Sequence, residues 1–371
     1  MCSSKATIVI VFLALSTMIL ACGPHSRELQ RMNAALEQAV AVYGDGNLEV
    51  EVDTALFISG LSEAPAYFAS KKQYDKAALA ALLNGYSEKD FDKEVAMASF
   101  KDAEHYGELA QDSLTTARAE YWMGKFLIET GRKEDALIKY KSADNHAGKH
   151  YSEKTFIDIG IATAYVLLNQ LDSAIIYLEN SMLYAQNSCL DNMEWKIFNN
   201  YAIIYRIHGE YDQALNCLKR ALGKPYIDDT KTAQVCLNIG KTFMAMGEMD
   251  SAGFYYQQME AALQVANVKK ETVVSAYEAL LKFAKTQGND SLALQYYDKH
   301  ENALFEVMSL RQEQTVYRIQ KQYDYAVMQN TMNKKLARNQ LVIAVVVVLL
   351  LCVLVLFLFH MAKASKREAL A

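Results

Sequence analysis

The chain has little proline, with three residues (Pro24, Pro65 and Pro225) in 371. Because proline breaks helices, long stretches of the sequence are free to form uninterrupted helices. A strong excess of one charge is also missing, since the formal net charge is -5. Proteins that bind nucleic acid directly usually carry a strongly basic domain, so we do not expect nucleic acid as a partner.

Motifs of catalysis and cofactor binding are missing as well. The sequence has no phosphate-binding P-loop, no dinucleotide glycine fingerprint, no GxSxG and no HExxH. His146 and His150 have the spacing of one helix face, but Gly148 lies between them and no third metal ligand is evident. We therefore expect no enzyme, no cofactor and no metal site.

The six cysteines do not form a set. Three of them lie in or beside apolar terminal segments: Cys2, Cys22 and Cys352. The other three are Cys189, Cys217 and Cys236. None of these has CxxC spacing, so we interpret them as small buried hydrophobes. A Cys217–Cys236 disulfide is the alternative, because an exported domain could hold one.

Residues 1–22 have the features of an export signal. Lys5 precedes an apolar run, Ala6 to Ala21, that ends in small residues. The ending Leu20-Ala21-Cys22 resembles the lipobox of bacterial lipoproteins, a family in which the cysteine becomes the lipidated first residue. The resemblance implies lipidation of Cys22. An uncleaved anchor or an ordinary signal peptide is the alternative.

A second apolar segment, residues 341–360, predicts a transmembrane helix. No charge interrupts it. At about 1.5 Å per residue, such a helix crosses a hydrocarbon core of roughly 30 Å. Cations flank it on both sides, so charge bias does not decide its orientation. The N-terminal signal does, and we expect an inner-membrane protein with residues 23–340 in the periplasm and a short cytoplasmic tail, 361–371.

Between these segments a pattern recurs. A small residue is followed by an apolar residue three positions on, a turn residue four further, an alanine five further, and an aromatic residue or leucine four further. The copies begin at Gly124, Ala162, Ala202 and Gly240, and a weaker fifth copy begins at Leu281, which is not small. Their alanines, with one upstream, recur every 38 to 41 residues: Ala96, Ala136, Ala174, Ala214, Ala252 and Ala293.

Each position of the pattern has a physical reason. Small residues are needed where two helices of a hairpin touch, and the large residue fills the space beside them. Glycine or asparagine ends the first helix in a left-handed cap. Asp172, Asp212 and Asp250 follow that turn, where an acidic residue favours the start of the second helix.

This pattern resembles the tetratricopeptide repeat, a helix–turn–helix unit of about 34 residues. The copies here are longer, which implies extended helices or turns. The resemblance predicts an all-α protein, with an α-solenoid of helical hairpins over residues 75–300. Residues 23–74 should form an N-terminal helical cap, in which Glu28 to Val42 is helical.

Residues 301–340 predict a long stalk helix leading to the membrane. Apolar residues with heptad spacing, followed by one asparagine, are typical of short parallel coiled coils. These residues are Val316, Ile319, Tyr323, Ala326 and Asn330. The stalk could therefore form a homodimer, and a single helix packing on the array is the alternative.

In the tetratricopeptide family the first helix of each hairpin lines a concave groove. The resemblance implies that such a groove includes Arg118, Tyr121, Lys125, Lys196, Asn199, Arg206, Lys241, Glu278, Lys282 and Lys285. Because cations dominate this set, we expect an acidic, extended peptide or protein segment as the ligand. The alternative is that these cations are ordinary solvated surface residues.

The whole layout also resembles membrane-anchored tetratricopeptide regulators of Gram-negative gut anaerobes. The resemblance is carried by residues 61–68, 74–78, 117–124 and 199–205. It implies a periplasmic sensor in signal transduction or transcriptional control. Only residues 361–371 follow the apolar segment, so an effector would be lost or supplied by a partner. A passive scaffold for envelope proteins is the alternative function.

Overall fold

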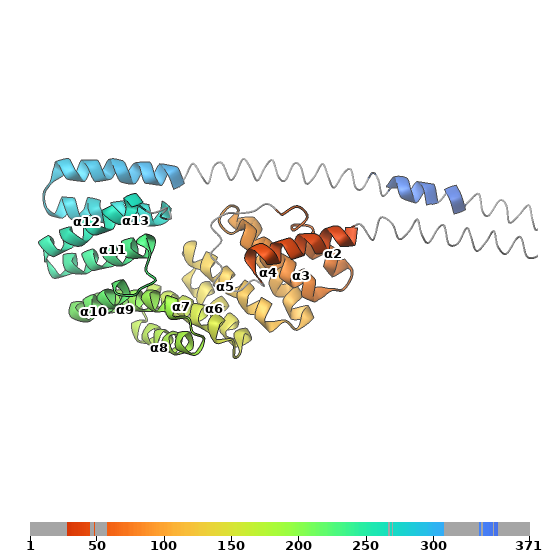
Figure 1. Cartoon of the computed structure of the whole chain (residues 1–371), viewed down its shortest axis with the longest axis horizontal. Coiled ribbons are helices and arrows are strands. Elements are labelled where there is room, and N and C mark those ends of the chain that lie inside the picture. Colours follow the sequence, from red (N-terminus) through yellow and green to blue (C-terminus); the bar gives the residue numbers. More distant parts are fainter. Residues whose placement is uncertain are drawn as a thin grey trace, which may run out of the picture. The chain divides into compact units, whose positions relative to one another are not determined.

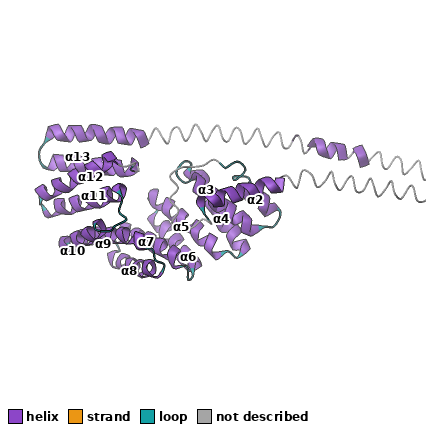
Figure 2. Ribbon diagram, viewed as in Figure 1, coloured by secondary structure: helices purple, strands orange, loops and turns teal. Residues whose placement is uncertain are grey.

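The computed structural model describes residues 28–44, 48, 58–265, 268, 270–307, 334, 337–343 and 345–347. Within these residues the regular elements are all helices (Figure 2). The chain divides into two units, residues 1–310 and 311–371. The hairpins described below all belong to the first unit, and they confirm the expected all-α class for the described part of the chain.

The helices follow one another along the chain with short connections (Figure 1). They are α2 (Ala64–Ser70), α3 (Tyr74–Glu88), α4 (Lys93–Ala110), α5 (Ser113–Glu129), α6 (Lys133–Ala147), α7 (Tyr151–Leu167), α8 (Leu171–Asn187), η1 (Asp191–Met193), α9 (Glu194–His208), α10 (Tyr211–Leu222), α11 (Asp229–Met246), α12 (Met249–Val265) and α13 (Lys270–Thr286). Helices also cover residues 28–43 and 290–307.

The helices pair as hairpins, and one helix of each pair forms a continuous layer. The hairpins are α3–α4, α5–α6, α7–α8, α9–α10 and α11–α12, and α13 pairs with the helix over 290–307. Each of α3, α5, α7, α9 and α11 also contacts the first helix of the next hairpin. We call α3, α5, α7, α9, α11 and α13 the first-helix layer. This is the packing that the tetratricopeptide resemblance predicts.

The recurrent residues take the predicted positions. All six periodic alanines are buried. The residues expected to end the first helices all have positive φ: Gly131 (78°), Asn169 (58°), Gly209 (80°), Gly247 (84°) and Gly288 (67°). Asp172, Asp212 and Asp250 lie in the first turns of α8, α10 and α12. The hairpin turns are therefore set by local sequence.

Small residues allow the helices of a hairpin to approach closely. A Cβ at Gly240 would lie 2.4 Å from the ring of Tyr256, the aromatic residue of the same copy. Tyr140 is held between two glycines, since a Cβ at Gly124 or at Gly160 would lie within 2.8 Å of its ring. The tyrosine rings thus occupy the space that the missing side chains leave.

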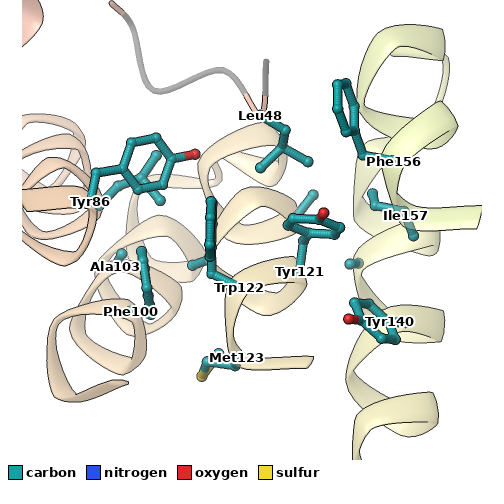
Figure 3. Packing of buried hydrophobic residues seen from close by; sticks show 14 of the residues in the cluster. Leu48, Tyr86, Phe100, Ala103, Tyr121, Trp122, Met123, Tyr140, Phe156 and Ile157 are labelled. Atoms are coloured by element: carbon teal, nitrogen blue, oxygen red, sulfur yellow. The ribbon is translucent and has the colours of Figure 1, made fainter. Parts of the chain in front are cut away.

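The core of the N-terminal hairpins is rich in aromatic residues (Figure 3). Trp122 of α5 stacks on Phe100 of α4, with ring centroids 6.0 Å apart, and meets Tyr86 of α3 edge-on at 5.6 Å. Leu48, which precedes α2, belongs to the same buried cluster. Offset and edge-on aromatic pairs stabilise beyond their buried area, so α3, α4 and α5 form a tightly packed start to the array.

The ends of the array differ in detail from the predicted boundaries. The helix over 28–43 and α2 stand where a helical cap is expected, and α3 begins at Tyr74. The last helix continues past residue 300 to 307, with Ala303 and Val307 buried. Residues 301–307 therefore complete the final hairpin. The coiled-coil seam at residues 316–330 lies outside the described residues.

The two predicted membrane segments are largely outside the description too. Residues 1–22, with Cys22, are not described, and neither are residues 344 and 348–360 of the predicted span. In the described ranges, no helix has the length and apolar character needed to cross a membrane.

Candidate peptide-binding face

Three cations from consecutive first helices come together in the C-terminal half of the array. Arg206 lies in the last turn of α9, Lys241 on α11 and Lys282 on α13. Arg206 and Lys241 are half-buried, and Lys282 is exposed. Lys241 interacts electrostatically with both of the other cations. We call these three residues the basic row.

The surroundings of Lys241 disfavour its positive charge. Burial lowers the pKa of Lys241, and the charges of Arg206 and Lys282 lower it further, while Glu278 opposes the shift. Burial also lowers the pKa of Arg206. Like charges that are partly removed from water repel each other more strongly than in solvent. A carboxylate placed among them would relieve that repulsion.

Polar side chains join the same helices next to the basic row. The amide of Asn238 on α11 donates a hydrogen bond to Asn199 on α9 at 2.8 Å. Gln234 on α11 faces Thr272 on α13, with Nε2 and Oγ1 3.4 Å apart. The face formed by α9, α11 and α13 therefore combines amides with cations, as a site for an extended acidic segment requires.

The remaining predicted residues of this half lie on the same helices. Lys196 is half-buried on α9, and Glu278 and Lys285 are exposed on α13. Glu278 is close enough to Lys241 to raise its pKa. The structure therefore brings Arg206, Glu278 and Lys282 close enough to Lys241 for their charges to act on it.

Two predicted ligand contacts in the N-terminal half are buried instead. Arg118 on α5 directs Nε (3.1 Å) and Nη2 (2.6 Å) at one carboxylate oxygen of Glu153 on α7, and both side chains are buried. Burial would raise the pKa of Glu153, but hydrogen bonds from Ser152 and Arg118 hold it below its usual value. Arg118 therefore links two first helices and does not present its charge to a ligand.

Tyr121 departs from the prediction in the same way. It is buried, and burial raises the pKa of its hydroxyl to about 12. The repeat pattern placed Arg118 and Tyr121 on the open face because it fixes each residue's angle around α5. The pattern does not show which other parts of the chain bury that side of α5.

Lys125 of the predicted set lies over an aromatic ring. Its ammonium is 4.3 Å from the ring centroid of Trp122, and the ammonium of Lys89 is 5.5 Å from the same ring. Cation–π attraction holds both charges near the indole face. Lys125 is half-buried, so the N-terminal half retains positive charge at the edge of an aromatic cluster.

The structure also contains a buried polar contact that the sequence pattern did not predict. Glu120 on α5 is almost fully buried and is 2.8 Å from Nδ1 of His146 on α6. Burial raises the pKa of Glu120, while hydrogen bonds from Ser142 and His146 oppose the rise. The spacing of His146 and His150 gave no signal of this partner. His146 therefore belongs to a hairpin contact, and no group of three metal-ligating side chains occurs in the part of the chain described.

The described cysteines are free, and their burial varies. Cys236 is buried, Cys217 is half-buried and Cys189 is exposed. The interpretation as buried hydrophobes is thus right for Cys236 and wrong for Cys189, which lies in the turn after α8 with positive φ. The alternative Cys217–Cys236 disulfide is not formed.

Solved structures with a similar course of helices share little sequence identity with this chain. BtubC (BKLC) from P. vanneervenii has a TM-score of 0.46 at 15% identity, over 64% of this chain and 94% of that chain. A tetratricopeptide repeat protein from Parabacteroides merdae has 0.43 at 12%, over 69% and 97%. The Rap conjugation gene regulator of plasmid pLS20, in complex with a peptide, has 0.46 at 16%, over 74% and 84%. No family model and no curated protein matches the chain.

Proposed function

We propose that this chain is a helical-repeat receptor that binds an acidic peptide or protein segment on its first-helix layer, without catalysing a reaction. The observation that carries the proposal is the basic row. Arg206, Lys241 and Lys282 come from three separate helices, and the charges of Arg206 and Lys282 both act on Lys241. A cluster that costs folding free energy in the unbound protein is explained if a ligand of opposite charge occupies it.

The proposal includes the place of the receptor in the cell. The apolar segments 1–22 and 341–360 and the lipobox-like Cys22 support an inner-membrane protein whose array lies in the periplasm. Binding outside and a stalk through the membrane together fit a sensor or regulator. A scaffold that gathers envelope proteins would use the same face without passing a signal on.

A binding experiment with charge reversals tests the receptor function. The full-length chain in mild detergent is titrated with a fluorescent deca-glutamate peptide at low and high salt. Arg206→Glu/Lys241→Glu should weaken binding at least about tenfold at low salt, because two attractive contacts become repulsive. Salt should weaken binding to the native chain more than to this variant.

The chain offers a matched control on the opposite helices. Lys101 on α4 and Lys219 on α10 are both exposed, so Lys101→Glu/Lys219→Glu makes the same change in net charge away from the first-helix layer. This variant should bind like the native chain. Equal losses in both variants would mean that only net charge matters, and the receptor proposal would then be rejected.

A further inference from the structure

The aromatic residue near the middle of a second helix is covered by the hairpin that follows it. Tyr140 on α6 meets Gly160 on α7, where a Cβ would lie 2.7 Å from the tyrosine ring. Tyr256 on α12 meets the ring of Phe283 on α13 edge-on, with centroids 5.3 Å apart. The equivalent residues of all copies before the last are buried: Phe100, Tyr140, Leu178, Leu218 and Tyr256.

A carboxylate one turn later pairs with the same following hairpin. In three copies an acidic residue stands four positions after the aromatic residue: Glu104, Asp144 and Glu260. Each pairs with a lysine of the next hairpin, in the same order: Lys139, Lys154 and Lys299. Because residues four apart are neighbours on a helix surface, the ring and the carboxylate form one contact surface for the following hairpin.

The last helix of the array carries the same pair of residues, but there they are exposed. Tyr297 and Glu301 stand at these two positions on the helix over 290–307, the light-blue helix after α13 in Figure 1. Tyr297 is 47% exposed, whereas its equivalents in the earlier copies are buried. Glu301 is exposed and lies 3.4 Å from Nδ1 of the adjacent His300. Within the described ranges no lysine pairs with Glu301.

Two further apolar residues extend this surface. Leu294 is 63% exposed and Phe305 is 71% exposed. Positions 294, 297, 301 and 305 follow one another in steps of three and four residues, so they lie on one side of the helix. We call Leu294, Tyr297, Glu301 and Phe305 the end face. Terminal repeats of a solenoid need a polar outer face for solubility, so an apolar end face indicates an interaction site.

Charge distinguishes between the possible occupants of the end face. A second copy would bring two end faces together, and each of them supplies the carboxylate of Glu301 and no cation. Anionic lipid would repel the same carboxylate. The sequence after Gly288 contains no glycine and no proline, the residues that most often turn a chain back, so we do not expect the chain's own later residues there. A helix that carries a cation meets the requirement.

We propose that the end face binds a helix of another protein in the position of a following first helix, with a lysine or arginine opposite Glu301 and a small or aromatic residue opposite Tyr297. Helix α7 shows that one helix can supply both groups, through Lys154 and Gly160. The end face and the basic row share no residue, so this interaction does not depend on the proposed peptide binding.

A peptide with the sequence of α7 tests the proposal. The probe is a fluorescein-labelled synthetic peptide of residues 149–167, and anisotropy follows its binding to the full-length chain in mild detergent. Glu301→Lys should weaken binding at least about fivefold at low salt, because it places a cation opposite Lys154 of the peptide. A peptide with Lys154→Glu should bind the Glu301→Lys chain more tightly than the native chain. Equal affinities of the two chains for both peptides would overturn the proposal.

Glu179 on α8 provides a matched control for net charge. It is an exposed carboxylate on a second helix, outside the end face. Glu179→Lys should bind both peptides like the native chain, and circular dichroism checks that the variants fold. Equal effects of Glu179→Lys and Glu301→Lys would mean that only net charge matters, and the end face would then not be the binding site.

Two further measurements exclude occupants from the chain itself. Sedimentation should give the same mass for the native chain and Phe305→Lys, and a native dimer that this variant dissociates would assign the end face to a second copy. Tyr297→Ser should lower the denaturation midpoint less than Tyr256→Ser, because Tyr256 is 1% exposed. Equal losses would show that the chain's own residues cover Tyr297. Either of these results would reject a partner helix.

Discussion

The ammonium group of Lys241 destabilises the folded protein at neutral pH. Its pKa is lowered by burial and by neighbouring cations, so the folded state binds this proton less tightly than the unfolded state does. The free-energy cost of the Lys241 charge to folding is present in full below the lowered pKa. It disappears as the pH rises toward the ordinary pKa of lysine. At neutral pH the charge is therefore a cost to folding.

Replacing Lys241 by methionine should consequently stabilise the array while weakening its ligand binding. We expect the free energy of unfolding to rise by about 0.5 kcal/mol, the size of a like-charge contact between partly exposed side chains. Chemical denaturation at low salt measures it, and the gain should shrink at high salt. Lys219→Met is the control. A loss of stability in Lys241→Met would contradict the assigned repulsion.

Asp158 on α7 makes a prediction about pH. It is almost fully buried, and burial, together with Asp144, raises its pKa to about 7 against the influence of Lys154. A folded pKa above the unfolded value means that the folded state binds more protons between about pH 4 and 7. The contribution of the Asp158 carboxyl to the free energy of unfolding is therefore present in full at acidic pH. It is lost as the pH rises through 7.

Asp158→Asn should remove this dependence. At pH 8 the variant should be more stable than the native chain, by up to about 4 kcal/mol on the scale of 1.36 kcal/mol per pKa unit, and near pH 4 the difference should vanish. Unfolding across pH 4–8 measures it. Asp298→Asn, on an exposed residue of the last helix, should run parallel to the native chain. Parallel curves for Asp158→Asn would disprove the raised pKa.

Within a helix pair, the contact between Gly240 and Tyr256 sets how closely α11 and α12 approach. Alanine at position 240 favours helix by about 1 kcal/mol, but its Cβ would overlap the ring of Tyr256. Overpacking of this kind costs about 1–3 kcal/mol, so Gly240→Ala should destabilise the chain. Calorimetry or denaturant unfolding measures the net change.

A double-mutant cycle identifies the ring as the cause. Tyr256→Leu removes the part of the side chain that a new Cβ would meet, so Gly240→Ala should cost less in the Tyr256→Leu background than in the native chain. Additive effects would show that the contact is not the source of the loss.

The sequence predicts those features of each helical hairpin that depend on neighbouring residues. The left-handed turns at Gly131, Asn169 and Gly209, and the buried alanines, follow from steric rules that act within one hairpin. The proximity of Lys241 and Lys282 also followed, because each comes directly after the first residue of its copy and the repeat period places equivalent positions side by side. Arg206 stands four positions after the first residue of its copy, so its proximity to Lys241 did not follow from the period.

Contacts between distant segments could not be predicted from that period. Arg118 is buried and pairs with Glu153, 35 residues away. Tyr121 shares a buried cluster with Leu48, a residue outside the repeats. Glu153 and Leu48 do not belong to the recurring pattern. A prediction from the repeat alone therefore placed Arg118 and Tyr121 among the ligand contacts.

For the whole molecule, the two apolar segments predict a membrane topology in which the repeats lie in the periplasm and the C-terminal tail lies in the cytoplasm. Alkaline phosphatase is active only outside the cytoplasm, and green fluorescent protein exported through the general pathway does not fluoresce. Fusions of phosphatase at Tyr205 should be active, and fusions of the fluorescent protein after Ala371 should fluoresce. This result is expected if residues 1–22 are an export signal and residues 341–360 span the membrane. Phosphatase that is inactive at Tyr205 would contradict the periplasmic sensor.

Carbodiimide cross-linking shows where an acidic ligand binds, because it joins carboxylates only to amines that they contact. Deca-glutamate is coupled to the full-length chain, and the modified lysines are identified by mass spectrometry. We expect cross-links at Lys241 and Lys282 in the first-helix layer, with Lys101 and Lys219 unmodified. Cross-links spread evenly over exposed lysines, or concentrated on α4 and α10, would contradict binding on this face.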